Sequence, residues 1–229
     1  MNLMKKRWIL LIVACTINLC AGSIYAWSVF APPLAERLSL LTGEALTAGS
    51  LAAAFSLANA VGPIPMILGG AVNDRFGPRW VIASGGLLIG LGFFLAATAE
   101  TTLSLILGYG IGFGLGLGLV YGSTINTTLK FFPDHRGLAG GLTTALYGLS
   151  SVILPPVALA LISAEGIQYA LIMLGTVFTV MIVSGGLFMQ KCPDGFEAKF
   201  RSSTAAPVRP AREELNWRGM LRARRFPPM

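Results

Sequence analysis

The chain has 229 residues, of which 54% are hydrophobic and 12% are charged, and its mean hydropathy is +0.71. A soluble domain carries about 25% charged residues, so this deficit favours a membrane protein and excludes an ordinary soluble enzyme. In a membrane the natural unit to count is a spanning helix of about 20 apolar residues.

Six stretches free of charged residues and histidine follow one another along the chain. They run from Trp8 to Phe30, Leu46 to Val72, Trp80 to Ala99, Leu103 to Asn126, Leu138 to Ala164 and Ile167 to Met189. Each can cross roughly 30 Å of hydrocarbon as an α-helix, which satisfies its own backbone hydrogen bonds in lipid. The sequence therefore predicts an all-α membrane protein with six transmembrane helices, forming one bundle over residues 1–189.

The ends of the chain carry less structural information. The basic start Lys5-Lys6-Arg7 is typical of a secretory signal, but the apolar run after it reaches Phe30 and is too long for one. We interpret that run as an uncleaved first span. Residues 190–229 are polar and are predicted to form a disordered cytoplasmic linker or tail, with a short interfacial helix starting near Leu215.

The basic residues predict the orientation. With the N-terminus in the cytoplasm, 16 of the 17 Lys and Arg residues lie on that side, and Arg37 is the exception. The positive-inside rule then places both termini in the cytoplasm of a multi-pass cell-membrane protein, which we expect in a bacterial inner membrane. Lipid is the expected surrounding partner. Nucleic acid is not expected, because no basic cluster is interleaved with stacking aromatics.

Cysteine usage gives no sign of a cofactor. Cys15, Cys20 and Cys192 form no C-x-x-C pair and have no accompanying histidine cluster. The sequence therefore predicts no metal site, no disulfide framework and no cofactor.

A polar loop is predicted between the second and third spans, with the sequence Gly69-Gly70-Ala71-Val72-Asn73-Asp74-Arg75-Phe76-Gly77-Pro78-Arg79. Glycine at 77 allows a sharp turn, and Asp74 can accept hydrogen bonds from a helix N-terminus or an arginine. Such a contact would latch one conformation, a role predicted for Gly70, Asp74, Arg75, Gly77 and Arg79. The alternative is an ordinary cytoplasmic loop, in which positive-inside statistics alone supply the arginines.

The loop resembles the G-x-x-x-D-R-x-G-R-R/K signature of the major facilitator superfamily, with Pro78 in place of a base. The stretches Gly22-Ser23-Ile24-Tyr25-Ala26-Trp27-Ser28-Val29-Phe30 and Phe132-Pro133-Asp134-His135-Arg136-Gly137-Leu138-Ala139-Gly140-Gly141 resemble its oxalate:formate antiporter family. The resemblance covers essentially the whole chain. It implies the N-terminal half of a secondary transporter for oxalate, formate or another monocarboxylate, working by alternating access and built as an inverted three-plus-three repeat.

Glycine occupies every second position from Gly108 to Gly118. At about 100° per residue these form two nearly opposite stripes, one of Gly108, Gly112 and Gly116 and the other of Gly110, Gly114 and Gly118. The pattern predicts close helix contacts on both faces of the fourth span. Prolines at positions 63, 65, 155 and 156 predict kinks, and whether these line a pathway is left open.

Four embedded aromatics are predicted to line a central cavity: Tyr25, Trp27, Tyr121 and Tyr147. Gly22-Ser23-Ile24-Tyr25 and Gly118-Leu119-Val120-Tyr121 lie at similar depths in oppositely running spans, as an inverted repeat requires. In the family resembled, such aromatics cage a small carboxylate, to which hydroxyl and indole N–H groups donate. The alternative is an interfacial aromatic belt, which suits Trp8 and Trp80 and partly Trp27.

No span contains a cation that could neutralise a carboxylate. The resemblance implies that such cations belong to a second bundle, so we expect a truncated product or one half of a split or dimeric carrier. A non-transporting remnant or membrane scaffold is the alternative. An enzyme is not expected, because the only histidine, His135, lies in a predicted loop and no nucleophile is paired with it.

Overall fold

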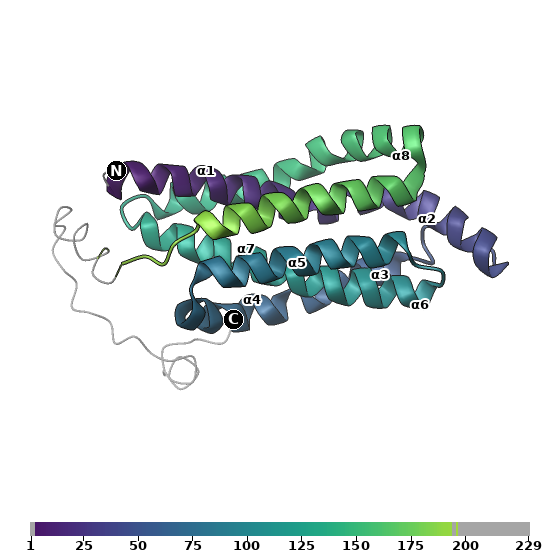
Figure 1. The fold of residues 1–229 in the computed structure, drawn as a ribbon, viewed down its shortest axis with the longest axis horizontal. Helices are drawn as coiled ribbons and strands as arrows, with labels where there is room; N and C mark the ends of the chain where they lie inside the picture. The colour runs from purple at the N-terminus through teal and green to yellow at the C-terminus, as the bar shows by residue number, and fades with distance from the viewer. Residues whose placement is uncertain (1–2, 194–195, 197–229) are drawn as a thin grey trace, which may run out of the picture.

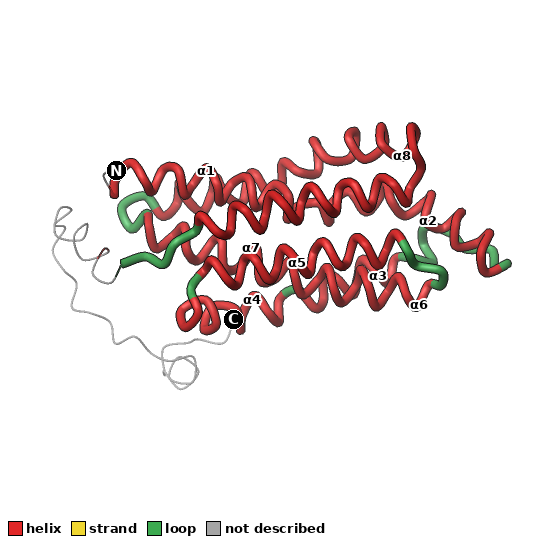
Figure 2. The backbone as a smooth tube through the Cα atoms, in the orientation of Figure 1, coloured by secondary structure: helices red, strands yellow, loops and turns green. Residues whose placement is uncertain are grey.

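The computed structural model describes residues 3–193 and Phe196. Within that part the chain is helical and contains no strand (Figure 2). The helices run along one long axis, and the chain reverses direction at the two ends of the bundle (Figure 1). We call the end that carries the N-terminus the near end and the opposite end the far end. The predicted tail structure after Phe196 lies outside the described residues.

The first helical run is longer than predicted. It consists of α1 (Leu3–Ala21), a short 3₁₀ segment η1 (Gly22–Ala26) and α2 (Trp27–Thr42), so the helical run continues past Phe30, where the predicted first span ends. The run continues because α2 buries Leu34 and Leu38 in the core beyond Phe30. Gly43 ends it in the left-handed conformation (φ 74°), donating from its N–H to the Ser39 carbonyl at 2.9 Å.

The second run is divided at Gly62 into α3 (Ala52–Val61) and α4 (Pro63–Phe76). Pro63 stands at the first position of α4, where a missing N–H costs little. Helix therefore starts at Ala52 and not at Leu46, and the loop expected over residues 69–79 shrinks to Gly77, since α5 (Pro78–Ala97) begins directly after it. The φ of 82° at Gly77 favours glycine at this turn.

The fourth run opens with α6 (Thr102–Leu105), capped by reciprocal hydrogen bonds between Thr101 and Ser104. It continues as a π-helix, η2 (Ile106–Phe113), and then as α7 (Gly114–Phe131). The π-helix was not predicted from the sequence. Its wider turns coincide with the start of the alternating glycines.

The last element, α8 (Arg136–Phe188), folds back on itself at Gly166, where φ is 84° and ψ is 171°. We call residues 136–165 its first arm and residues 167–188 its second arm; they lie at the predicted fifth and sixth spans. The backbone stays helical through Pro155 and Pro156, where kinks were expected.

Four described helical runs are long and apolar enough to cross a membrane: Lys6–Thr42, Pro78–Ala97, Thr102–Phe131 and Arg136–Phe188. Ala52–Ile67 is a shorter apolar stretch. The all-helical membrane fold class is therefore confirmed for the described part, whereas the count of six crossings stays a prediction.

The fourth run packs on its neighbours through glycine. Gly108 and Gly116 lie against Leu95, Gly85 and Ile89 of α5, while Gly110, Gly114 and Gly118 lie against α3, the Gly62 joint and α4. A Cβ added at Gly116 would stand 2.6 Å from the Gly85 carbonyl oxygen, and one at Gly114 would stand 2.7 Å from that of Ala58. Both distances are too short for a side chain, so glycine permits this backbone approach.

At the far end, one backbone carbonyl oxygen accepts hydrogen bonds from two other helices. The carbonyl oxygen of Ala97, the last residue of α5, accepts a hydrogen bond from Arg37 Nη1 at 2.8 Å and another from Gln168 Nε2 at 3.2 Å. The positive charge of Arg37 also suits the negative end of the helix dipole. These bonds join α2, α5 and the second arm of α8.

We expect Gly116→Ala to destabilise the bundle by about 1–3 kcal/mol, because the added methyl overpacks a backbone contact. Gly148→Ala is the matched control, since nothing lies within 4 Å of a Cβ added there. Thermal unfolding of the purified protein in detergent measures both. Equal melting temperatures for the two variants would contradict the close contact between α5 and α7.

Candidate functional site

Three of the predicted cavity residues come together in the structure. The ring centroids of Tyr25 and Tyr147 are 5.3 Å apart in an edge-to-face arrangement, and those of Tyr121 and Tyr147 are 4.6 Å apart. Tyr25 comes from the first run, Tyr121 from α7 and Tyr147 from the first arm of α8. We call these residues the tyrosine cluster.

A close contact between the first run and α8, next to the tyrosine cluster, positions its residues. Ser150 Oγ donates to the Gly22 carbonyl oxygen at 2.8 Å, and a Cβ at Gly22 would collide with Ser150 and with the Tyr147 carbonyl. Glycine therefore lets the first run approach α8 at this level. The contact lies at the start of η1, whose tighter 3₁₀ turns carry the chain from Gly22 to Tyr25.

The tyrosine cluster is partly exposed. Tyr25 is 44% exposed, and Tyr121 and Tyr147 are half-buried. Phenol hydroxyls donate and accept hydrogen bonds without carrying charge at neutral pH, so the cluster offers an anion neutral donors on an apolar wall.

Trp27 lies apart from the tyrosine cluster. Its ring is 4.8 Å from that of Tyr109 and 6.3 Å from that of Phe55, and the residue is 7% exposed. Trp27, the first residue of α2, thus packs against α3 and η2. Its predicted contact with substrate stays a prediction, and the structure gives it a packing role.

Tyr109 is an embedded tyrosine that the sequence analysis did not single out. It is fully buried in η2, stacked on Phe113 at 4.7 Å with nearly parallel rings. Its hydroxyl has no hydrogen-bond partner among the described residues. The sequence signal was available, since Tyr109 is a polar-tipped aromatic in the middle of an apolar glycine run.

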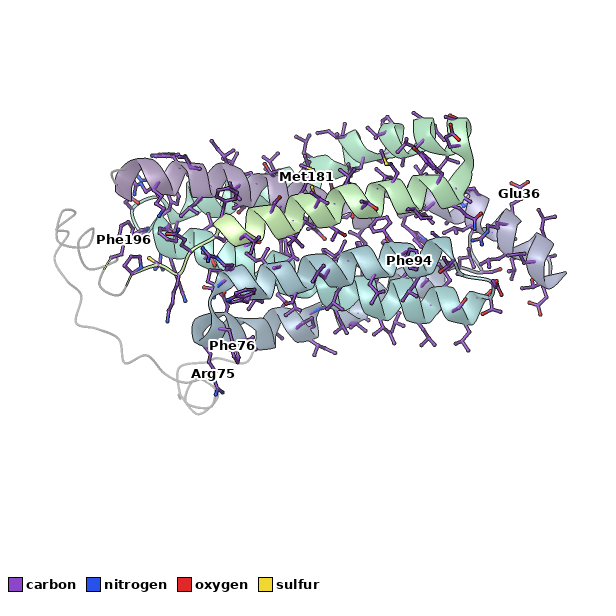
Figure 3. All side chains as sticks on the ribbon, viewed as in Figure 1. Glu36, Arg75, Phe76, Phe94, Met181 and Phe196 are labelled. Atoms are coloured by element: carbon purple, nitrogen blue, oxygen red, sulfur yellow. The ribbon has the colours of Figure 1, made fainter. Side chains whose placement is uncertain are left out.

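The segment predicted as a latch lies at the near end. Gly70 and Asp74 fall in the second half of α4, but their surroundings are not described. Arg75 is exposed, with its guanidinium carbon 5.5 Å from the Phe76 ring centroid, and Arg79 is exposed in the first turn of α5. Figure 3 shows Arg75 and Phe76 pointing away from the bundle. The latch role stays a prediction.

A partly buried ion pair lies at the near end. Arg7 Nη1 donates to both carboxylate oxygens of Asp134 at 2.8 and 2.9 Å, and the two side chains are 6% and 16% exposed. His135 Nδ1 lies 2.9 Å from Asp134 Oδ2, and the guanidinium carbon is 5.0 Å from the Phe132 ring centroid. The pair ties α1 to the loop between α7 and α8.

This ion pair also sets the protonation of Asp134. Partial burial of the carboxylate favours its neutral form, but hydrogen bonds from Arg7 and His135 outweigh that effect and hold the pKa of Asp134 below its usual range. The carboxylate is therefore charged at neutral pH and remains so into mildly acidic solution.

Two fixed features of the described part define a class: apolar helices long enough to cross a bilayer, and neutral polar aromatics gathered in one partly exposed cluster. These features are those of a helical membrane protein. A family model described as the Major Facilitator Superfamily matches residues 5–227, and the chain belongs to that superfamily.

The chain is also similar to individual transporters. Over 193 residues the chain is 30% identical to the uncharacterized MFS-type transporter YhjX of Escherichia coli (strain K12), covering 84% of this chain and 46% of the relative. It is 30% identical over 183 residues to the oxalate:formate antiporter of Oxalobacter formigenes (80% and 42% covered). It is 32% identical over 183 residues to human monocarboxylate transporter 11 (80% and 38%). The chain spans less than half the length of these relatives, in their N-terminal half.

The ion pair predicts a pH-dependent stability. Because the pKa of Asp134 is lowered in the folded protein, its stabilisation is present above the ordinary carboxyl pKa and is lost as pH falls through the folded value. Asp134→Asn should cost about 0.5–1.5 kcal/mol at neutral pH, because solvent screens an ion pair whose acidic partner is partly exposed.

Thermal unfolding between pH 7 and pH 4 tests this expectation. Asp134→Asn should unfold at a lower temperature at pH 7 and lose less stability on acidification than the unmodified chain. Glu44→Gln, at an exposed position of the far end, serves as the control. An acid response unchanged by Asp134→Asn would contradict the assignment.

Proposed function

We propose that this chain forms the N-terminal bundle of a secondary carrier for small organic anions and works by alternating access with a second bundle. The observation that carries the proposal is the tyrosine cluster, in which three helical runs bring neutral hydroxyl donors together in one partly exposed group. Hydroxyl donors suit carboxylate oxygens, and the apolar surroundings strengthen such hydrogen bonds.

The substrate class follows from the relatives together with this chemistry. Relatives are named for oxalate, formate and monocarboxylates. A small carboxylate can accept hydrogen bonds from the tyrosine cluster, which offers a few neutral donors and no fixed charge. We therefore propose oxalate, formate or another small monocarboxylate as the substrate.

The need for a second bundle is supported by charge and by packing. None of the six uncharged stretches supplies a cation for a buried carboxylate. In addition, the first arm of α8 has small residues with open space beside them: nothing lies within 4 Å of a Cβ added at Gly137, Gly141 or Gly148. Small residues allow close helix approach in membranes. A continuation of the chain, a separate chain or a second copy would fit this face.

We further propose six membrane crossings with both termini in the cytoplasm. This proposal is supported by the reversal of α8 at Gly166 and by the concentration of basic residues at the near end. Single cysteines at Glu100 and at Arg136, in a chain carrying Cys192→Ser, test it in intact cells. A membrane-impermeant reagent should label Glu100→Cys from outside and Arg136→Cys only after permeabilisation. The opposite pattern would invert the topology.

Reconstitution in liposomes tests the function. The chain alone should exchange no labelled oxalate or formate, and exchange should appear when a second-half bundle is co-expressed. In that assembly Tyr147→Phe should lower exchange about tenfold, because it removes one hydrogen bond to a charged group while keeping the ring. Tyr169→Phe, exposed on the second arm of α8, is the matched control.

Two results would refute the proposal. Robust exchange by a demonstrated monomer would show that one bundle suffices. Unaltered exchange by Tyr147→Phe in the active assembly would show that the tyrosine cluster does not bind the substrate.

A further inference from the structure

The chain continues to pack on the bundle after α8 ends at Phe188. Met189 and Phe196 are both buried, and Phe196, at 5% exposed, belongs to the hydrophobic core. Figure 1 shows the described chain running on from the end of α8 toward the near end, and Figure 3 shows Phe196 there. We call residues 189–193 together with Phe196 the strap.

Two polar contacts join the strap to other helices. Lys6 Nζ of α1 donates to Gln190 Oε1 at 2.7 Å. The Cys192 thiol donates to the carbonyl oxygen of Lys130, in the last turn of α7, at 3.4 Å. The strap therefore links the second arm of α8 to the near ends of α1 and α7.

An aromatic contact adds to this link. The Phe196 ring meets that of Phe131, the last residue of α7, edge-on with centroids 5.8 Å apart. The loop that follows Phe131 carries Asp134, which pairs with Arg7 of α1. Because Lys6 and Arg7 are neighbours, one turn of α1 is tied both to the strap and to this loop.

The way in which the strap is held allows it to open. Residues 190–193 form no helix, so the hydrogen bonds of a regular element do not hold them. The bond from Lys6 to Gln190 is exposed to water, and a thiol is a weak donor. Burial of Phe196 is opposed by the conformational entropy of the ordered residues before it. A segment balanced in this way can open locally while the rest of the fold stays intact.

We propose that the strap is a releasable device that closes over the near end of the bundle. When docked, it fastens the last turn of α7 to α1 and α8; when undocked, it frees that turn and the loop after it. Any displacement of the chain beyond Phe196 acts on this contact before it reaches the helices. The helix that the strap fastens also carries Tyr121, ten residues and roughly 15 Å before Phe131. The device requires only the folded bundle and is independent of the proposed transport function.

Thiol labelling of the full 229-residue chain in detergent tests this device, because the chain carries its own reference. Cys20 is buried in the core and reports unfolding of the bundle, whereas Cys192 reports the strap. N-ethylmaleimide should modify Cys192 under native conditions while Cys20 stays unmodified, as measured by mass spectrometry after digestion. Phe196→Ala should speed the modification of Cys192 at least about tenfold, because it removes a buried aromatic ring. Phe188→Ala, exposed at the end of α8, is the matched control and should leave the rate unchanged.

Amide hydrogen exchange tests the effect on α7. In Phe196→Ala the last turn of α7 should exchange faster, and the middle of α5, which the strap does not contact in the described part, should exchange as before. A second variant keeps the test sound if Phe196→Ala fails to fold. Gln190→Ala removes only the exposed hydrogen bond and should speed the modification of Cys192 about threefold.

Three results would overturn the proposal. Modification of Cys192 only together with Cys20 would show that the strap opens only when the whole bundle unfolds. An unchanged rate at Cys192 in every variant that folds would show that these contacts do not hold the strap. Faster modification of Cys192 without faster exchange in the last turn of α7 would show that the strap does not fasten this helix.

Discussion

Close backbone contact through glycine is the constraint on which the other features of this bundle depend. Lipid tails are as apolar as the side chains they touch, so helices in a bilayer associate through close packing and not through hydrophobic exclusion from water. The fourth run meets α5 on one face and α3 with α4 on the other, and glycines make both contacts. A side chain at Gly118 would collide with the Gly62 carbonyl and so displace α4. Because Tyr121 follows Gly118 by less than one turn, the same contact fixes the level of one member of the tyrosine cluster.

The sequence predicted the helical membrane class well and the helix ends poorly, and both outcomes have one cause. Charge is costly in hydrocarbon, so uncharged stretches mark membrane depth. They do not mark where a helix stops, and α2 therefore runs to Thr42, twelve residues past the predicted end at Phe30. The turn at Gly77 was predicted, because this glycine lies between two apolar stretches, and it has the positive φ that glycine favours. Gly166 turns the chain in the same way but was not singled out from the sequence. The π-helix η2, which packs against α3 and α5, was not predicted from the sequence.

The candidate site was predicted in part for a geometrical reason. Residues two apart on a helix project about 200° apart, so Tyr25 and Trp27 could not share one face even before the structure was known. Trp27 accordingly packs on Tyr109 and Phe55, while Tyr25 meets Tyr147. The repeated Gly-x-x-Tyr pattern was the better guide, because Tyr25 and Tyr121 both contact Tyr147. The Arg7–Asp134 pair could not be predicted, since its partners are 127 residues apart in sequence.

Charge in the described part is confined to the two ends of the bundle, where it holds helices together. Arg7 pairs with Asp134 at the near end, and Arg37 binds the terminal carbonyl of α5 at the far end. Between these ends the tyrosine cluster is neutral, so its hydroxyls can orient a carboxylate but cannot compensate for its desolvation, which costs several kcal/mol or more. On the proposed function, the two tasks are therefore divided: this bundle supplies shape and hydrogen-bond direction, and the second bundle supplies the positive charge. Such a division would make affinity depend on the approach of the two bundles, which is the motion that alternating access uses.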